Sequence, residues 1–204
     1  MDSPTWTPPT RRQETLAEPV EPDRLKILIA GGFGVGKTTM VGSVSEIRPL
    51  TTEAPMTMAS VGIDDLSRTE AKTHTTVALD FGRITIEEEN LRVYLFGTPG
   101  QDRFWFMWDE LARGAVGAAV VVDTCRVEDC FPAVDYFLER RLPFVVAVND
   151  FDNSFQYEPD EVREALDLDQ DIPIITFDAR NAHSVRHVLI AVVVQAAHAQ
   201  SVSL

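Results

Sequence analysis

The sequence has few cysteines, few basic residues and no long apolar run. Cys125 and Cys130 are its only cysteines, and no histidine cluster accompanies them, so we expect two reduced thiols rather than a disulfide or a metal pair. Lysine and arginine number 18 against 32 acidic residues, for a formal net charge of -14. That charge argues against nucleic acid and anionic lipid surfaces as partners. No apolar run approaches the ~20 residues that a membrane-spanning helix needs, and neither end has a lipidation motif. We therefore expect a soluble cytoplasmic protein without a membrane anchor of its own.

Prolines are frequent in the first 24 residues, among threonine, glutamate and arginine. So few apolar residues accompany them that this stretch has little to bury, which predicts a disordered N-terminal arm over residues 1–24. The remaining length suits one domain, which we expect over residues 25–200.

A glycine-rich motif follows the first apolar run, residues 25–30. Residues 31–38 are Gly-Gly-Phe-Gly-Val-Gly-Lys-Thr, which fits the phosphate-loop pattern Gly-x-x-x-x-Gly-Lys-Thr, and a preceding buried strand is the context that this pattern requires. A plain glycine-rich turn is the alternative. Glycines let successive N–H groups point to one centre, and the N-terminus of the next helix adds positive partial charge. We predict nucleotide binding by Gly31, Gly34, Val35, Gly36, Lys37, Thr38 and Thr39, with Lys37 on the terminal phosphates and the Thr38 hydroxyl on Mg²⁺.

The rest of the chain predicts an α/β fold. A first helix is expected over residues 39–47, and a long loop without periodicity over 50–75. Residues 76–86 and 91–96 alternate around a polar turn, which predicts a β-hairpin. Apolar strands then alternate with helices, with strands expected at 116–122, 144–148 and 172–176 and helices at 127–140, 158–166 and 184–198. We therefore predict a P-loop NTPase three-layer sandwich: a mostly parallel sheet with one antiparallel edge strand and helices on both faces.

Ligands bind such sheets beyond the C-terminal ends of the strands. In this chain those ends are followed by the phosphate loop and by residues 97–101, 149–152 and 178–180. The order of these motifs resembles that of Ras-like small GTPases. Residues 76–82, Thr-Val-Ala-Leu-Asp-Phe-Gly, and residues 95–104, Leu-Phe-Gly-Thr-Pro-Gly-Gln-Asp-Arg-Phe, are most similar to two bacterial groups. These are the gliding-motility GTPase of MglA type and, more closely, the small ATP/GTP-binding protein encoded in actinobacterial conservon operons (CvnD-type). The resemblance covers about residues 25–195.

This resemblance implies two catalytic residues. Thr76 would sense the γ-phosphate and ligand Mg²⁺, and Thr75 is the alternative because neighbouring threonines leave the register open. Gln101 would orient the attacking water, as in related switches. Gly100 would place its N–H on the γ-phosphate. An ordinary strand residue at position 76 and a solvated loop residue at position 101 are the non-functional alternatives.

The resemblance also implies guanine recognition. Residues 149–152, Asn-Asp-Phe-Asp, are similar to the base motif Asn-Lys-x-Asp. Asn149 belongs to this motif, and the Asp152 carboxylate would accept hydrogen bonds from the N1–H and 2-amino group of guanine, which selects GTP and GDP over adenine nucleotides. The Ala179 N–H would face the guanine O6, and Arg180 stands where the family has a lysine.

Three residues depart from the family pattern. Gly97 stands in place of the aspartate that holds Mg²⁺ through water in most members. Asp150 replaces the lysine that covers the base, and Asp178 replaces a serine. Arg68 and Lys72 lie in the first switch loop, but neither aligns with a catalytic arginine.

Residues 104–108 are Phe-Trp-Phe-Met-Trp, and neither a helix nor a strand can direct all five toward one core. An exposed partner surface and burial under the long loop both explain them.

We therefore expect a cytoplasmic small GTPase switch that binds GTP or GDP with Mg²⁺ and hydrolyses GTP slowly without a partner. The resemblance implies a roadblock-fold (longin-like) regulatory protein, a sensor-kinase-like component and recruitment to the membrane through partners. A catalytically inactive pseudo-GTPase scaffold is the main alternative, and a small-molecule kinase is the third. The oligomeric state stays open.

Overall fold

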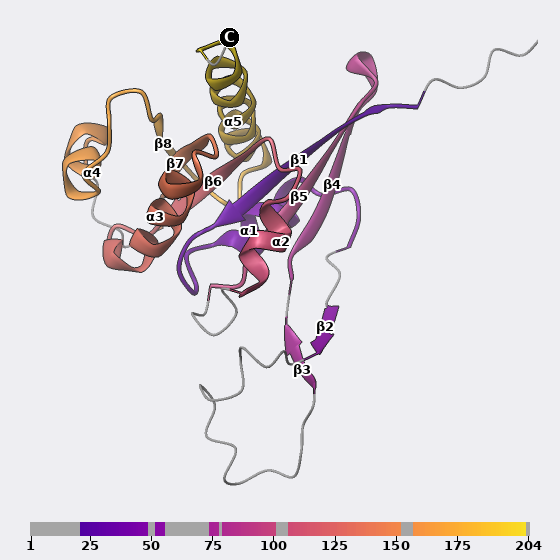
Figure 1. Cartoon of the computed structure of the whole chain (residues 1–204), viewed down its shortest axis with the longest axis horizontal. Helices are drawn as coiled ribbons and strands as arrows, with labels where there is room; N and C mark the ends of the chain where they lie inside the picture. Colours follow the sequence, from indigo (N-terminus) through magenta and orange to yellow (C-terminus); the bar gives the residue numbers. More distant parts are fainter. Residues whose placement is uncertain are drawn as a thin grey trace, which may run out of the picture.

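A computed structural model of the protein describes residues 21–48, 52–55, 74–77, 79–100, 106–151 and 157–202 (Figure 1). The strands are β1 (Asp23–Ala30), β2 (Thr52–Pro55), β3 (His74–Val77), β4 (Phe81–Ile86), β5 (Leu91–Gly97), β6 (Gly117–Val122), β7 (Phe144–Asn149) and β8 (Ile174–Phe177). The helices are α1 (Lys37–Val44), α2 (Trp108–Ala112), α3 (Phe131–Arg140), α4 (Pro159–Ala165) and α5 (Ala182–Val202), with 3₁₀ turns η2 (Glu87–Glu89) and η4 (Val127–Cys130).

Six strands form the main sheet in the order β4-β5-β1-β6-β7-β8. All neighbours are parallel except β4 and β5, which are antiparallel and place β4 at one edge. The predicted α/β class with a mostly parallel sheet and one antiparallel edge strand is thus confirmed. Because β1 lies inside the sheet, the loop that follows it opens at the C-terminal edge, between the ends of β5 and β6.

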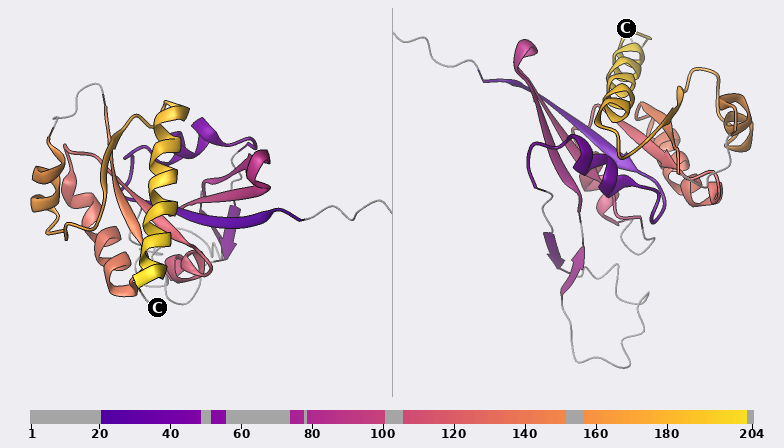
Figure 2. Two further views of the ribbon diagram at one scale, coloured as in Figure 1. Left: turned by 90° about the horizontal axis from the view of Figure 1, so that it is seen from above. Right: turned by 180° about the vertical axis from the view of Figure 1, so that it is seen from behind.

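Side chains from the two faces of the sheet enter separate apolar cores, because successive strand residues point to opposite faces. In β1, Leu28 faces a core shared with α2 and α3, whereas Ile27 and Ile29 face a core shared with α1 and α5. Figure 1 shows α2 and α3 in front of the sheet, and the view from behind in Figure 2 shows α1 and α5 on the other face. The three-layer arrangement with helices on both faces is therefore also confirmed.

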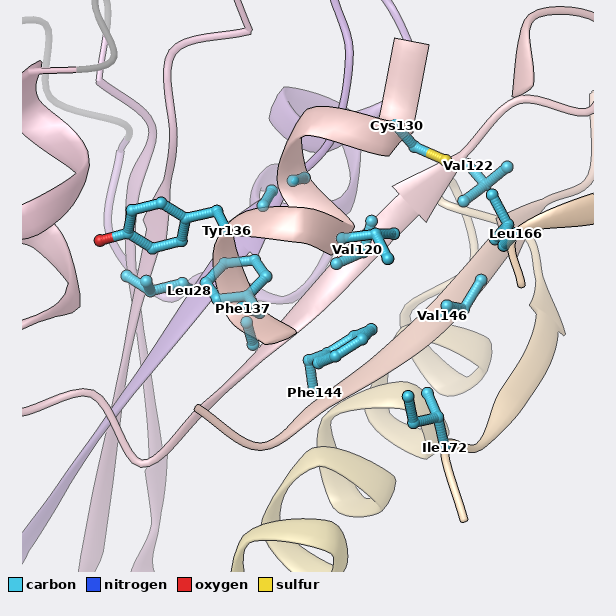
Figure 3. Packing of buried hydrophobic residues seen from close by; sticks show 14 of the residues in the cluster. Leu28, Val120, Val122, Cys130, Tyr136, Phe137, Phe144, Val146, Leu166 and Ile172 are labelled. Atoms are coloured by element: carbon cyan, nitrogen blue, oxygen red, sulfur yellow. The ribbon is translucent and has the colours of Figure 1, made fainter. Parts of the chain in front are cut away.

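The core shared with α2 and α3 contains a group of packed aromatic rings (Figure 3). Phe137 is fully buried, and its ring centroid lies 5.3 Å from that of Tyr136, 5.9 Å from Phe144 and 6.0 Å from Trp108. Trp108 ends the aromatic segment 104–108, and its side chain is buried, so burial rather than a partner surface explains this residue. Phe106 and Met107 are partly buried, and residues 104 and 105 lie outside the described part of the chain.

The structure divides the predicted hairpin strand 76–86. Its first part belongs to β3, which pairs with β2 inside the predicted loop 50–75, and its second part is β4. Figure 1 shows the β2–β3 pair apart from the six-stranded sheet. Alternation alone could not locate this break, because β-branched residues stand on both sides of it, at positions 76–77 and 84–86. Asp80 lies at the break, immediately before β4.

Several other boundaries also shift. β1 begins at Asp23, two residues before the predicted start of the domain, because parallel pairing with β5 extends the strand beyond its apolar part. The helix predicted over residues 127–140 is the 3₁₀ turn η4 followed by α3, which has Pro132 in its first turn. The rest of the predicted arm, residues 1–20, lies outside the described residues. Cys125 is exposed and Cys130 is buried, both as free thiols. None of the helices in the described part of the chain combines the length and the apolar character needed to cross a membrane.

Candidate functional site

The phosphate loop connects β1 to α1 at the C-terminal edge of the sheet. Gly34 and Gly36 adopt φ angles of 77° and 105°, which favour glycine. A Cβ on Gly36 would lie 2.5 Å from the side-chain nitrogen of Asn149, so the loop also has no space for a side chain there. The helix begins at Lys37, two residues earlier than predicted, so its first turn directly follows the loop. The backbone therefore has the form that the motif predicts.

The side chain of Lys37 is buried against the loop. Its Nζ donates to the carbonyl oxygens of Gly31 at 2.8 Å and Gly32 at 2.5 Å. Burial lowers the pKa of Lys37 to about 8, an effect that the negative charge of Asp80 partly opposes. At neutral pH the amine is still mainly protonated, so a partly desolvated cation is held in the loop.

Gly100 approaches the same cation from the segment that follows β5. A Cβ at this position would lie 2.8 Å from the Lys37 Nζ and 2.8 Å from the Gly32 carbonyl oxygen. Only glycine fits this contact without a shift of the loop. Thr98, two residues earlier, is buried, and its hydroxyl oxygen has no hydrogen-bond partner among the described residues. The structure thus brings the predicted Gly100 and Lys37 together.

The hydroxyl of Thr38 donates to Oδ2 of Asp80 at 2.7 Å. Asp80 also occupies the space beside Gly97, where an added Cβ would lie 2.8 Å from the Asp80 Cβ and 3.0 Å from its Oδ2. The carboxylate that the family pattern expects at position 97 of β5 is therefore replaced in space by one that precedes the adjacent strand β4. Asp80 belongs to none of the predicted site residues, and its signal in the sequence was the missing side chain at Gly97.

Oxygen donors such as these suit Mg²⁺, which takes carboxylate, hydroxyl and phosphate ligands. Among the described residues no group of three or more His, Cys, Asp and Glu side chains gathers to hold a metal ion alone. The donor set fits a site in which the protein supplies Thr38 and Asp80 and a phosphate supplies the rest.

Asn149 joins the phosphate loop to the segment after β8. Its side-chain nitrogen donates to the carbonyl oxygen of Val35 at 3.1 Å, and its side-chain oxygen accepts from the Ala179 N–H at 3.0 Å. The side chain is 3% exposed. Asn149 therefore positions two loops, a role that the sequence did not assign to it. Because the Ala179 N–H already has this partner, its contact with a base stays a prediction.

Asp178 and Arg180 form an ion pair within the segment after β8. The guanidinium donates from Nε to Oδ1 of Asp178 at 2.9 Å and from a terminal nitrogen to Oδ2 at 3.2 Å. These hydrogen bonds lower the pKa of Asp178. The Arg180 side chain, predicted to bind the nucleotide, is thus held by the residue that departs from the family pattern.

Several predicted residues cannot be placed in this site. Gln101 and Asp152 lie outside the described residues, as do Arg68 and Lys72. Thr75 and Thr76 lie in β3, but the structure describes only their backbone. Thr39 is exposed in the first turn of α1. The part that the structure brings together is the phosphate half of the site, with Gly31, Gly34, Val35, Gly36, Lys37, Thr38 and Gly100.

Comparisons with known sequences give a family. The model of a family described as "conserved hypothetical ATP binding protein" matches residues 29–199. The uncharacterized protein MJ1339 of Methanocaldococcus jannaschii is 28% identical over 132 residues, which are 64% of this chain and 72% of that protein. The Ras-related protein Rab-7b of Bos taurus is 26% identical over 167 residues, covering 77% of this chain and 74% of that protein.

Solved structures give the same fold. The G domain of FeoB from Methanococcus jannaschii matches with a TM-score of 0.56 at 12% identity, over 85% of this chain and 98% of that chain. The G domain of the T. maritima FeoB iron transporter matches with a TM-score of 0.57 at 16% identity, over 82% of this chain and 98% of that chain. At these identities the likeness shows the G-domain fold alone.

Proposed function

Because the chain belongs to the family of conserved hypothetical ATP-binding proteins and has the G-domain fold, we propose that it is a small Ras-like GTPase switch. It binds GTP or GDP with Mg²⁺ and hydrolyses GTP slowly unless a partner assists. Family, fold and Ras-related sequence relatives support a nucleotide-binding, GTPase-like protein. The observation that carries the proposal is the convergence of Gly31, Gly32 and Gly100 on the Lys37 amine.

In this proposal the loop N–H groups and Lys37 bind the phosphates. Thr38 and Asp80 hold Mg²⁺, which neutralises charge on the transferring phosphoryl group when bound. Thr76 senses the γ-phosphate, and Gln101 orients the attacking water. Asp152 selects guanine, although the family description names ATP, so the choice of base is the first point to test.

GTP, GDP, ATP and ADP compete against a fluorescent GDP analogue in the first experiment, with and without Mg²⁺. Displacement by guanine nucleotides alone supports the proposal, whereas equal displacement by adenine nucleotides rejects the role of Asp152. Lys37→Ala should abolish binding. Lys26→Ala is the matched control, because the Lys26 amine donates at 2.9 Å to the Arg113 carbonyl oxygen, outside the loop.

A pseudo-GTPase scaffold is the second candidate. Two observations favour it: Asp178 engages Arg180, and Asp150 adds negative charge beside the predicted base site. Single-turnover hydrolysis separates the two functions. If the purified protein binds GTP but Gln101→Leu leaves its rate unchanged, the catalytic role of Gln101 fails.

We also propose a cytoplasmic location and membrane recruitment through partners. A roadblock-fold (longin-like) regulatory protein and a sensor-kinase-like component are the proposed partners, by the resemblance to the MglA-type and conservon groups. Faster GTP hydrolysis on addition of such a regulator would support this assignment, and an unchanged rate in a complex that does form would reject it.

A further inference from the structure

Arg126 lies against the phosphate loop and belongs to none of the motifs described above. It follows β6 in a turn that is closed by a hydrogen bond from its N–H to the Asp123 carbonyl oxygen at 2.9 Å. A Cβ on Gly34 would lie 3.7 Å from a terminal guanidinium nitrogen of Arg126. The guanidinium is thus adjacent to the loop that binds phosphate in the proposed function.

Two carboxylates hold this guanidinium in place. One terminal nitrogen lies 3.1 Å and Nε 3.4 Å from Oδ2 of Asp123, and the other terminal nitrogen lies 3.5 Å from Asp129. Asp123 is itself fixed, because it is buried and its Oδ1 accepts from the Cys125 N–H at 2.9 Å. Asp129 packs against the loop. A Cβ added to Gly32 would lie 2.5 Å from the Cβ of Asp129.

The guanidinium can bind a further anion. Arginine has five N–H donors, and the two hydrogen bonds to Asp123 use only part of them. The side chain is 46% exposed, and the neighbouring Phe33 and Gly34 are also exposed. Its planar array of donors suits the oxygens of a phosphate group.

Charges of both signs lie near the loop. A nucleoside diphosphate brings several negative charges to a chain whose formal net charge is -14. Lys37 lies within the loop, and Arg180 is engaged by Asp178. Asp80 adds a negative charge beside Thr38. Arg126 is a further cation beside the loop, and because Asp123 and Asp129 balance its charge, what it offers a bound phosphate is a directed N–H donor.

We propose that Arg126 binds a phosphate oxygen of the nucleotide from the Gly34 side of the loop. This inference rests on the proposed nucleotide binding and adds to that site a phosphate-binding residue from outside the loop motif. The contact does not depend on the base, because it is made to the phosphates.

The test compares Arg126→Met, which keeps the length of the side chain without its charge, with Arg113→Met. Arg113 forms an exposed i,i+3 ion pair with Glu110, so it is a matched control from another surface. GDP and ADP displace a fluorescent GDP analogue from each variant, and thermal unfolding checks the fold. A hydrogen bond to a charged group at a half-exposed site predicts about tenfold weaker binding for Arg126→Met. Any nucleotide that binds the wild type should lose affinity by the same factor, and Arg113→Met should match the wild type.

Asp129→Asn separates phosphate binding from a purely structural ion pair. It keeps the shape of the side chain but removes a carboxylate that competes for the guanidinium, so we expect binding several-fold tighter than wild type. If Arg126 served only to pair with Asp129, both variants would weaken binding alike. That result, or unchanged affinity in a folded Arg126→Met, overturns the inference and leaves the proposed function standing. A wild type that binds neither nucleotide overturns both.

Discussion

The contact between Asp80 and Gly97 predicts that their two positions can hold one carboxylate but not two. In Gly97→Asp, the new Cβ would start 2.8 Å from the Asp80 Cβ and 3.0 Å from its Oδ2. Two carboxylates about 4 Å apart repel by about 4 kcal/mol at an effective dielectric constant of 20, and partial exposure to water reduces this. With the steric overlap, we expect the free energy of unfolding to fall by about 2–4 kcal/mol.

Urea unfolding measures this loss, and Gly97→Asn is the matched variant, because its side chain has nearly the same shape without the charge. It should lose only the steric part, about 1–2 kcal/mol. The exchange Asp80→Gly with Gly97→Asp removes the overlap and should recover stability to within about 1 kcal/mol of wild type. If Gly97→Asp unfolds at the same urea concentration as the wild type, the side chains at the two positions do not compete for this space.

The exchanged pair and a further variant, Asp80→Asn, test the metal site. Asp80→Asn should weaken the Mg²⁺ dependence of nucleotide release, whereas the exchanged pair should retain it, since a carboxylate remains beside Thr38. Equal Mg²⁺ dependence in Asp80→Asn and wild type would exclude Asp80 as a metal ligand.

Three further predictions concern the rest of the site and its support. The lowered pKa of Lys37, about 8, leaves roughly one tenth of its amine protonated at pH 9 before binding. A bound phosphate favours the protonated form, so binding at pH 9 should take up nearly one proton and be up to about tenfold weaker than at pH 7. Calorimetry in two buffers of different ionisation enthalpy measures this proton uptake. If no proton is taken up at pH 9, the Lys37 amine does not bind the phosphates. Asn149→Ala leaves the Val35 carbonyl and the Ala179 N–H without their partner and should cost about 2–4 kcal/mol in urea unfolding. Asn181→Ala, at an exposed position where the side-chain oxygen accepts from the His183 and Ser184 N–H groups at the start of α5, should cost less, about 1 kcal/mol. Phe137→Ala removes a fully buried ring and should cost about 3–5 kcal/mol, whereas Leu138→Ala, at a 44% exposed position, should cost far less.

The phosphate half of the site could be predicted because its signals are local. Glycine spacing, an apolar strand before it and Lys37 after it all lie within fifteen residues, and together they favour a phosphate loop over a plain glycine-rich turn. The alternation of apolar strands and helices likewise gave the sheet class. The Thr38–Asp80 contact joins residues 42 positions apart, and alternation placed Asp80 inside a continuous strand. No local pattern could have revealed it.

Other details depended on packing that only the folded chain defines. The sequence of residues 104–108 does not indicate which of these five large apolar side chains is buried. Trp108 is buried because it packs against the rings of Tyr136 and Phe137, which are distant in sequence. Similarly, Asn149 was predicted as part of a base motif, but its two hydrogen bonds join loops from opposite ends of the chain. The partners of such a side chain follow from strand order rather than from its neighbours in sequence.

Asn149 also has a consequence for how a ligand would meet this site. Its side chain joins the phosphate loop to the segment after β8 by hydrogen bonds within the protein itself, so these contacts fix the two loops relative to each other. Ordering them is then largely part of folding rather than of binding, which lowers the entropy cost of association. Because linkage is reciprocal, a ligand that tightens one loop also stabilises the other. A fragment that occupies only the phosphate loop should therefore rigidify residues 178–180, which it does not touch.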